Sequence, residues 1–422
     1  MSIIQPVRGT HDLIGENQRR HSHVVSAARR ISALYGFGEW STPIFEDTRV
    51  FSRSLGDTSD VVSKEMYSFS DRDGESITLR PEGTAAICRA LVTNGLTQSL
   101  PQKVFYAGPM FRYERPQKGR YRQFHQIGVE LMGAAEPQAD AEVIALGYQI
   151  LQDLGVAEHV TLELNTLGDA ASREAWREAL IAYFSRYKDQ LSEDSRVRLE
   201  KNPLRILDSK DRSDRALVAD APQMAEFLTP EASTFWDDLR RTLDNFGISY
   251  RVNTSIVRGL DYYNHTTFEF VTDKLGSQGT VMAGGRYDGL VKQMGGPAVP
   301  SVGLAAGVER LSMLLDTAPE PARPVIIVPV GSPAEGTVFK VLQSLRQQGV
   351  YVEMGYRGSL RKRMERAGKQ NAAYVLFLGE DEVERGVCRI KHMESGQESE
   401  VTLDSVLSDA ATFFLSGEKA AI

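Results

Sequence analysis

Apolar residues recur near the start of the chain at the spacing of an amphipathic helix. Intervals of three or four positions separate Val24, Ala28, Ile31 and Leu34. This spacing places the four side chains on one helix face. The pattern predicts a short strand followed by a helix over residues 1–35, with helix-capping candidates at residues 10–12 and a break from Gly36 onward.

Short extended runs dominate the segments that follow. They occupy residues 66–69, 76–79, 104–110 and 126–132, and a helical pattern fits residues 83–93. Similar runs return at residues 250–256, 267–271 and 279–282, before a helical pattern at residues 303–315. Several strands with little helix between them predict a largely antiparallel sheet, because parallel strands need long crossover connections.

Two further segments divide the chain. Residues 169–246 are charged and helical in period, which predicts an inserted helical subdomain. Residues 316–324 contain three prolines, which is typical of an extended linker. Beyond it, apolar runs at residues 324–330, 350–354 and 373–378 alternate with helical segments. This alternation predicts a small α/β domain with a mainly parallel sheet.

Composition narrows the classes of protein without identifying one. A chain of 422 residues with 41% hydrophobic and 25% charged residues favours a globular protein of two or three domains. The net charge of −7 argues against a protein that coats DNA, and we expect no DNA partner. The two cysteines form no CxxC pair, which favours a reducing compartment. Without a signal-peptide pattern or a long apolar run, we expect a cytoplasmic location and no membrane.

The segment at residues 111–126 carries the densest candidate chemistry. Between Arg112 and Arg122 it holds five basic residues and one acid, Glu114, and its turn residues predict a long hairpin loop. Guanidinium groups match phosphate oxygens in pairs, and an aromatic ring such as that of Phe124 offers a stacking face for a base. A solvated charged hairpin is the alternative.

Four other segments each allow two interpretations. At residues 79–84, Glu82 could receive an ammonium group or simply belong to a turn with a helix cap. Residues 257–264 combine an Arg-Gly pair with two tyrosines, and residues 283–289 and 303–310 are rich in glycine or small residues. Ordinary turns and tight packing also explain them. The histidines at positions 11, 21, 23, 125, 265 and 392 show no metal-ligand spacing, and no nucleophilic triad or Walker loop is present in the sequence.

Taken in order, these segments resemble the histidyl-tRNA synthetases, a class II aminoacyl-tRNA synthetase family. The three class II motifs resemble residues 36–55, 111–126 and 303–310, the two histidine-specific signatures resemble residues 258–264 and 283–290, and the insertion matches at residues 202–210. The resemblance implies an α+β fold with an antiparallel sheet flanked by helices. It also implies a catalytic domain at residues 1–320, with a helical insertion at 169–246, and a C-terminal α/β anticodon-binding domain at residues 324–422.

The resemblance implies a histidine–tRNA ligase, which forms histidyl-adenylate from L-histidine and ATP and then transfers the acyl group to the 3′ end of histidine tRNA. Arg112 and Arg258 would flank the α-phosphate as catalytic residues. The other implied ATP-binding residues are Glu114, Arg120, Phe124 and Arg310. The implied histidine-binding residues are Glu82, Thr84, Gln126, Glu130, Tyr262 and Tyr263. Mg²⁺ would bridge the phosphates, and no protein side chain is assigned to it.

The same resemblance implies contacts with tRNA and with a second copy of the chain. Arg115 and Gln117 match the part of the hairpin that reads the acceptor end. Arg361 and Lys362 lie in a basic stretch, residues 357–369, that would face the anticodon stem, although a solvated helix surface explains the stretch equally well. A homodimer is implied through residues 36–55.

Two rival functions share parts of this pattern. One is a catalytically inactive synthetase paralogue that acts as regulatory subunit of ATP phosphoribosyltransferase. Such a paralogue is not expected to keep Arg112, Arg258 and Arg310 together with a C-terminal domain. The other is a module that binds RNA or senses uncharged tRNA, which normally belongs to a longer chain.

Overall fold

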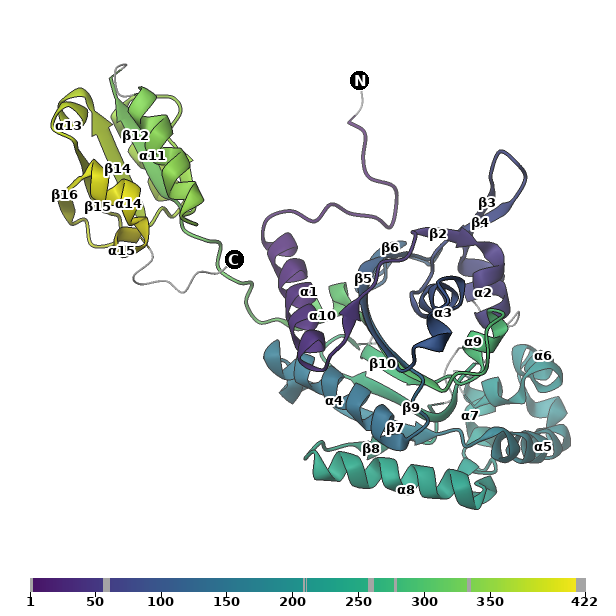
Figure 1. The fold of residues 1–422 in the computed structure, drawn as a ribbon. Coiled ribbons are helices and arrows are strands. Elements are labelled where there is room, and N and C mark those ends of the chain that lie inside the picture. The colour runs from purple at the N-terminus through teal and green to yellow at the C-terminus, as the bar shows by residue number, and fades with distance from the viewer. Residues whose placement is uncertain are drawn as a thin grey trace. The chain divides into compact units, whose positions relative to one another are not determined.

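The computed structural model describes residues 3–55, 61–207, 209, 211–256, 262–276, 279–331 and 335–414. The chain divides into two compact units, Met1–Pro319 and Glu320–Ile422. Figure 1 shows the helices and strands of each unit. No described helix is both long and apolar enough to cross a membrane.

An eight-stranded sheet forms the centre of the first unit. In spatial order its strands are β1 (Gly38–Glu39), β5 (Gln102–Phe111), β6 (Gln123–Met132), β11 (Ser301–Gly307), β10 (Thr280–Arg286), β9 (Asn264–Val271), β7 (Thr161–Thr166) and β8 (Arg251–Val252). The pairs from β5 to β7 are antiparallel, whereas β1 and β8 pair with their neighbours in parallel. The predicted antiparallel sheet is therefore confirmed, with a parallel strand at each edge.

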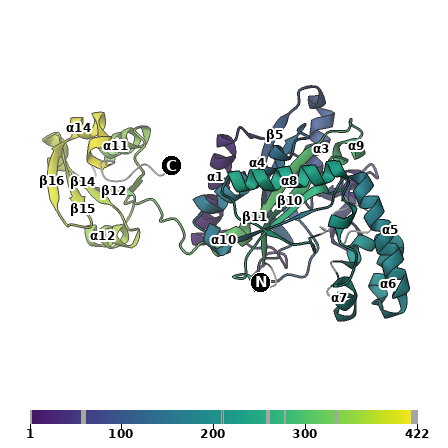
Figure 2. The same cartoon turned by 90° about the horizontal axis from the view of Figure 1, so that it is seen from below.

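Side chains of the sheet alternate between two apolar cores. Phe105 of β5 packs into one core, and its neighbours Val104 and Tyr106 pack into the other. The first core includes helices α1 (Glu16–Leu34), α4 (Pro137–Asp153), α8 (Pro230–Asn245) and α10 (Val308–Leu314). The second includes α2 (Thr48–Leu55), α3 (Thr84–Thr93) and α9 (Leu290–Gln293). Helices thus cover both faces of the sheet, as the two views in Figures 1 and 2 show.

The sequence prediction fails at several places in this unit, and strand β7 and helix α2 are among the elements that it did not predict. No strand is present among residues 3–15, and α1 begins after Gly15 without a side-chain cap from residues 10–12. Helix α4 was not predicted, because apolar and small residues occupy most positions around its circumference. Its sequence therefore lacks a clear alternation of apolar and polar faces. Residues 303–307 belong to β11 and not to a helix, because they pair on both sides with β6 and β10.

Side chains cap the first turns of three helices in the insertion and fix where these helices begin. Asp169, Ser192 and Asp211 accept hydrogen bonds from backbone N–H groups at the starts of α5 (Ala170–Arg186), α6 (Glu193–Lys201) and α7 (Arg212–Val218). These helices pack around Trp176, Leu180 and Phe184 in the second core. Helix α8, by contrast, adds Leu239 and Leu243 to the first core.

Smaller elements complete the first unit. A separate sheet has the order β2 (Phe45–Asp47), β4 (Ser76–Leu79) and β3 (Tyr67–Ser70). Among the described residues, short turns of 3₁₀ or π helix lie at η1 (Val61–Glu65), η2 (Leu96–Gln98), η3 (Ala157–His159), η4 (Lys188–Gln190), η5 (Pro203–Ile206) and η6 (Met224–Phe227).

The second unit is a five-stranded sheet covered by helices. Its strand order is β13 (Val352–Met354), β12 (Val325–Val330), β14 (Tyr374–Gly379), β15 (Val387–His392) and β16 (Glu398–Thr402). The first three strands are parallel and the last two are antiparallel, so the predicted α/β arrangement is confirmed. Its helices are α11 (Glu335–Gln347), α12 (Leu360–Lys369), α13 (Glu380–Glu384), α14 (Leu403–Ser408) and α15 (Ala410–Phe414).

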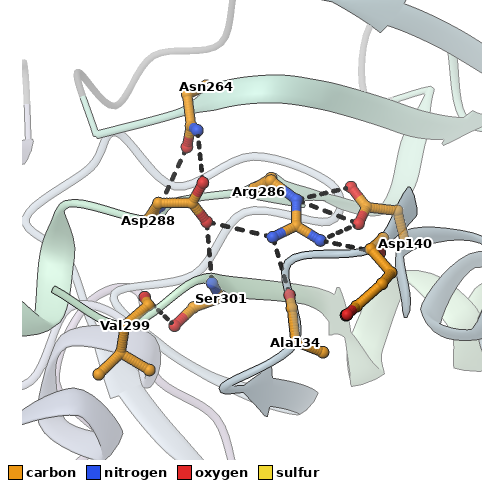
Figure 3. A network of polar contacts seen from close by, with 8 residues as sticks. Ala134, Asp140, Asn264, Arg286, Asp288, Val299 and Ser301 are labelled. Carbon is orange, nitrogen blue, oxygen red and sulfur yellow. Dashed lines mark hydrogen bonds and ion pairs between the residues drawn. The ribbon is translucent and has the colours of Figure 1, made fainter. Parts of the chain in front are cut away.

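A buried ion pair connects α4 to the central sheet (Figure 3). Arg286 of β10 and Asp140 of α4 have side chains only 1% and 0% exposed, and Arg286 Nε lies 3.1 Å from Asp140 Oδ2. Arg286 Nη1 also donates to Asp288 at 3.2 Å, and Asp288 accepts from the Asn264 amide at 2.8 Å and from the backbone N–H of Ser301 at 2.9 Å. Burial raises the pKa of Asp140, against the attraction of Arg286. The network therefore holds three strands against one helix.

Replacing Arg286 with methionine tests this network. Arg286→Met leaves a buried carboxylate without its partner, so we expect the free energy of unfolding of the first unit to fall by about 3–5 kcal/mol. The three tryptophans of the chain, Trp40, Trp176 and Trp236, all lie in this unit, so urea unfolding followed by tryptophan fluorescence reports on it. Arg241→Met is the matched control, because Arg241 is 69% exposed in its pair with Asp238. Equal losses in both variants would contradict the assignment.

Candidate active site

A cavity of about 310 Å³, here called the central pocket, opens over the middle of the eight-stranded sheet. The β5–β6 hairpin, the start of α3, strands β9 to β11 and the start of α10 all contribute to its wall. Many of the residues singled out in the sequence line it: Glu82, Thr84, Arg112, Glu114, Arg120, Phe124, Gln126, Glu130, Tyr262, Tyr263 and Arg310.

Glu130 of β6 is the most deeply buried carboxyl group of the pocket, with only 1% of its surface exposed. The hydroxyl of Thr84 donates to its Oε1 at 2.7 Å, and the hydroxyl of Tyr287 donates to its Oε2. Burial raises the pKa of Glu130 to about 8, although these hydrogen bonds oppose the shift. The group therefore changes its charge near neutral pH.

Gly303 makes room for this carboxyl group. Strand β11 places Gly303 directly opposite Glu130 in the antiparallel ladder. A Cβ atom at position 303 would lie 1.7 Å from Glu130 Oε2 and 2.6 Å from the backbone oxygen of Val129. Only glycine allows Glu130 to fold across this strand, which explains one of the small residues in the segment 303–310.

Glu82 caps helix α3. Its two carboxylate oxygens accept hydrogen bonds from the backbone N–H groups of Thr84 at 2.6 Å and Ala85 at 2.9 Å. Burial raises the pKa of Glu82, and these bonds partly offset the shift. The structure therefore supports the helix-cap interpretation, while the wall of the pocket still includes the carboxyl group.

Three guanidinium groups meet in the pocket, those of Arg112, Arg120 and Arg310. Arg112 Nε donates to the backbone oxygen of Pro81 at 2.9 Å. Arg310 donates to two backbone oxygens, from Nε at 3.1 Å and from Nη1 at 2.8 Å. Burial lowers the pKa of Arg310, and the charges of Arg120 and Arg112 lower it further. Such a concentration of positive charge favours an anionic ligand.

The remaining predicted residues of the pocket include acceptors and aromatic rings. Gln126 Oε1 is buried and has no hydrogen-bond partner among the described residues. The rings of Tyr262 and Tyr263 lie 4.7 Å apart, and the backbone oxygen of Tyr263 accepts from Arg173 of the insertion at 2.7 Å. The guanidinium carbon of Arg112 lies 5.3 Å from the centre of the Phe124 ring. The pocket therefore combines charged, amide and aromatic groups.

Several residues singled out in the sequence are not among those that line the pocket. Arg115 and Gln117 are exposed in the β5–β6 loop, where Gln117 pairs with Arg120 through backbone hydrogen bonds of 3.2 and 2.9 Å. Arg361 and Lys362 are exposed on α12 of the second unit, and Arg361 forms a 3.0 Å ion pair with Glu365. Arg258 lies outside the described residues.

Tyr287 and Glu309 line the pocket but were not predicted as site residues. Tyr287 follows Gly284 and Gly285, and the segment stands out in the sequence by its glycines and not by its aromatic ring. Glu309 holds the backbone N–H of His125 through both oxygens at 3.0 Å, across 184 residues of sequence. A contact over such a separation leaves no local pattern.

Comparisons with known proteins cover almost the whole chain. Residues 9–311 match the family model for histidyl-tRNA synthetase, and residues 324–410 match that for an anticodon binding domain. A histidine–tRNA ligase of Gluconacetobacter diazotrophicus is 68% identical over 96% of this chain and 98% of its own length. The corresponding ligase of Rhodospirillum rubrum is 54% identical over 98% of this chain and 100% of its own length.

The solved structures agree with these relatives. The crystal structure of the apo histidyl-tRNA synthetase of S. aureus superposes with a TM-score of 0.82, at 32% identity, and covers 98% of this chain and 100% of its own. These relatives carry the name of the ligase and not of a regulatory paralogue. The chain therefore belongs to the histidyl-tRNA synthetase family.

Proposed function

We propose that the chain catalyses the ligation of histidine to histidine tRNA in two steps at the central pocket. Histidine and ATP first form histidyl-adenylate and pyrophosphate, and the histidyl group then moves to the 3′ end of the tRNA. The observation that best supports this function is a single cavity lined both by the buried carboxyl group of Glu130 and by three arginines. That arrangement suits a small polar ligand joined to a polyphosphate.

Histidine would bind on the Glu130 side of the pocket. The imidazole ring has two polar nitrogens, one of which donates a hydrogen bond when the ring is neutral. The Glu130 carboxylate would accept that bond and the Tyr263 hydroxyl would serve the other nitrogen, with Tyr262 packed beside it. Thr84 and Tyr287 already hold the carboxyl group in place. An analogue without the ring N–H would leave the buried carboxylate one hydrogen bond short, which disfavours its binding.

The α-amino group of histidine would lie near Glu82 and Thr84. Glu82 is fixed by its bonds to the first turn of α3, so its orientation does not depend on the ligand. Gln126 would bind the polar backbone atoms of the amino acid, because its buried Oε1 lacks a partner among the described residues. These groups would position the histidine carboxylate for attack on the α-phosphate.

ATP would bind on the arginine side of the pocket. Arg112 would neutralise the α-phosphate, with Arg258 on the opposite side stabilising the charge of the transition state. Arg120, which lies 3.1 Å from Glu114, would contact the outer phosphates. Phe124 and Arg310 would stack on the two faces of the adenine ring. These residues would hold the nucleotide while histidine attacks.

Mg²⁺ would accompany ATP and neutralise part of its phosphate charge. The ion prefers oxygen ligands, and carboxylates supply them in proteins. Glu114 and Glu269 are carboxyl groups of the pocket wall that are not assigned to histidine, so they could hold the ion. The residues present thus fit a magnesium site on the phosphate side.

The tRNA would contact both units. Arg115 and Gln117 are exposed in the β5–β6 loop and would meet the acceptor end. Arg361 and Lys362 on α12 would contact the phosphates of the anticodon stem. A second copy of the chain would cover the apolar residues Ile44 and Phe45, which are 44% and 57% exposed.

Histidine-dependent exchange of pyrophosphate into ATP tests the proposed function directly. We expect exchange with histidine and Mg²⁺, and none when histidine is omitted. Arg112→Ala should lower kcat by about a hundredfold or more, because it removes charge stabilisation in the transition state. Arg115→Ala is the matched control: it should leave exchange unchanged and reduce only transfer to tRNA. A purified protein without any exchange activity would refute the proposal.

The pKa of Glu130 predicts a pH dependence of histidine binding. In the ligand-free protein the pKa is about 8, so at lower pH the carboxyl group must lose a proton before it accepts the ring N–H. The histidine KM should therefore fall by up to about tenfold per pH unit as the pH rises toward 8. Above this pH the KM should become constant. The side chain at position 130 cannot titrate in Glu130→Gln. The pH profile of this variant therefore shows the effect that the titration of free histidine alone has on the KM. Identical pH profiles in the two proteins would contradict this role.

The close approach of Gly303 to Glu130 predicts the effect of adding one methyl group. Gly303→Ala should displace the Glu130 carboxyl group and raise the histidine KM by about tenfold or more, since 1.4 kcal/mol of lost binding has that effect. The ATP KM should change much less. Gly289→Ala is the control, because no atom lies within 4 Å of a Cβ at that position. Equal changes in both variants, measured by pyrophosphate exchange, would contradict the steric argument.

A further inference from the structure

Two histidines and a glutamate meet at the edge of the central pocket. His21 comes from α1, His125 from β6 and Glu309 from α10, and one candidate ligand atom of each lies within 4.8 Å of the other two. His125 Nδ1 is 2.8 Å from Glu309 Oε1. The rings of His21 and His125 are 4.5 Å apart and nearly perpendicular, at 81°.

We propose that these three side chains form a binding site for a divalent transition metal ion, with Zn²⁺ as the ion that fits best. Two imidazoles and one carboxylate are a common ligand set for zinc sites that keep one position for water. Ligands about 2.0–2.2 Å from a tetrahedral zinc ion lie about 3.3–3.6 Å from one another. The three side chains therefore need only small movements to hold an ion.

A second cavity gives access to this cluster. It has a volume of about 440 Å³, and its wall includes His11, His21 and Glu309. Glu309 and Tyr121 also line the central pocket, so the two cavities share part of their walls. The second cavity leaves room for an ion to enter and for water to act as a fourth ligand.

The hydrogen bonds of the described residues account for only two members of the cluster. Glu309 accepts from the backbone N–H of His125 and contacts its ring. His21 Nε2 is buried and has no hydrogen-bond partner among the described residues. An unpaired buried nitrogen is costly, and an ion in the cluster would give this imidazole a partner.

The existing contacts of the cluster also suit a metal ion. An ion would replace only the contact between Glu309 Oε1 and the His125 ring. The bond from the His125 backbone N–H to Glu309 Oε2 would remain.

An ion at this position would connect α1 to the ATP side of the central pocket. His125 lies between Phe124 and Gln126 on β6, and Glu309 immediately precedes Arg310. Fixing His125 and Glu309 would restrict the backbone beside these pocket residues. The site thus forms a bridge from the N-terminal helix to both the β5–β6 hairpin and α10.

Metal binding to the full-length chain tests the proposal. The protein is first treated with a chelator and kept free of ATP. When Zn²⁺ is then titrated into it in a calorimeter, one equivalent of Zn²⁺ per chain should bind at this site. Co²⁺ in place of Zn²⁺ should produce the visible absorption of a four-coordinate complex. His21→Ala should weaken this equivalent by about tenfold or more, as expected when one of three ligands is lost.

His23→Ala is the matched control, because His23 lies on the same helix and is not part of the cluster. It should retain the full equivalent and the Co²⁺ spectrum. Added Zn²⁺ should raise the Tm of the wild-type chain and His23→Ala, but not of His21→Ala. His21→Gln keeps a polar side chain and is the second variant, which separates loss of the metal from a disturbed fold. It should bind Zn²⁺ as weakly as His21→Ala. The proposal is wrong if the wild-type chain binds no stoichiometric Zn²⁺, or if His21→Ala and His21→Gln bind it as tightly as His23→Ala.

Discussion

The antiparallel pairing of β6 with β11 is the constraint on which the rest of the catalytic unit depends. Its register sets Glu130 opposite Gly303, and only a residue without a side chain can face a carboxyl group folded across the sheet. The same pairing sets Gln126 opposite Gly307, just before the helix that carries Arg310. One ladder of hydrogen bonds therefore joins the histidine side of the pocket to its nucleotide side. A shift of one residue would turn every side chain of β6 to the other face.

Two buried carboxyl groups in this unit are stabilised in different ways. Asp140 lies against Arg286, so its charge is balanced within the protein. Among the described residues, the hydroxyl groups of Thr84 and Tyr287 donate hydrogen bonds to Glu130, and burial raises its pKa to about 8. The first arrangement suits a structural connection, because each charge has its partner within the protein. The second suits recognition of a ligand that can itself donate a hydrogen bond, because no cationic side chain in the described part of the chain forms an ion pair with this carboxyl group.

Some residues that line the pocket also stabilise the surrounding helices and strands. Glu82 caps α3 and at the same time presents a carboxyl group to the pocket. Glu309 holds the β6 backbone at His125 and places Arg310 one residue later. Such shared residues hold the functional side chains at the starts of these helices in place. A side chain fixed in this way needs little reorganisation when a ligand arrives.

The sequence by itself determined the fold class, the division at the proline-rich linker and the family, because local periodicity and ordered motifs carry that information. Eleven of the site residues expected from the sequence line the central pocket. The tertiary structure decided what depends on register and distant contacts. The opposition of Glu130 and Gly303, the role of Tyr287 and the meeting of His21, His125 and Glu309 all join residues far apart in the chain. No local pattern records such contacts, since strand pairing and helix packing alone create them.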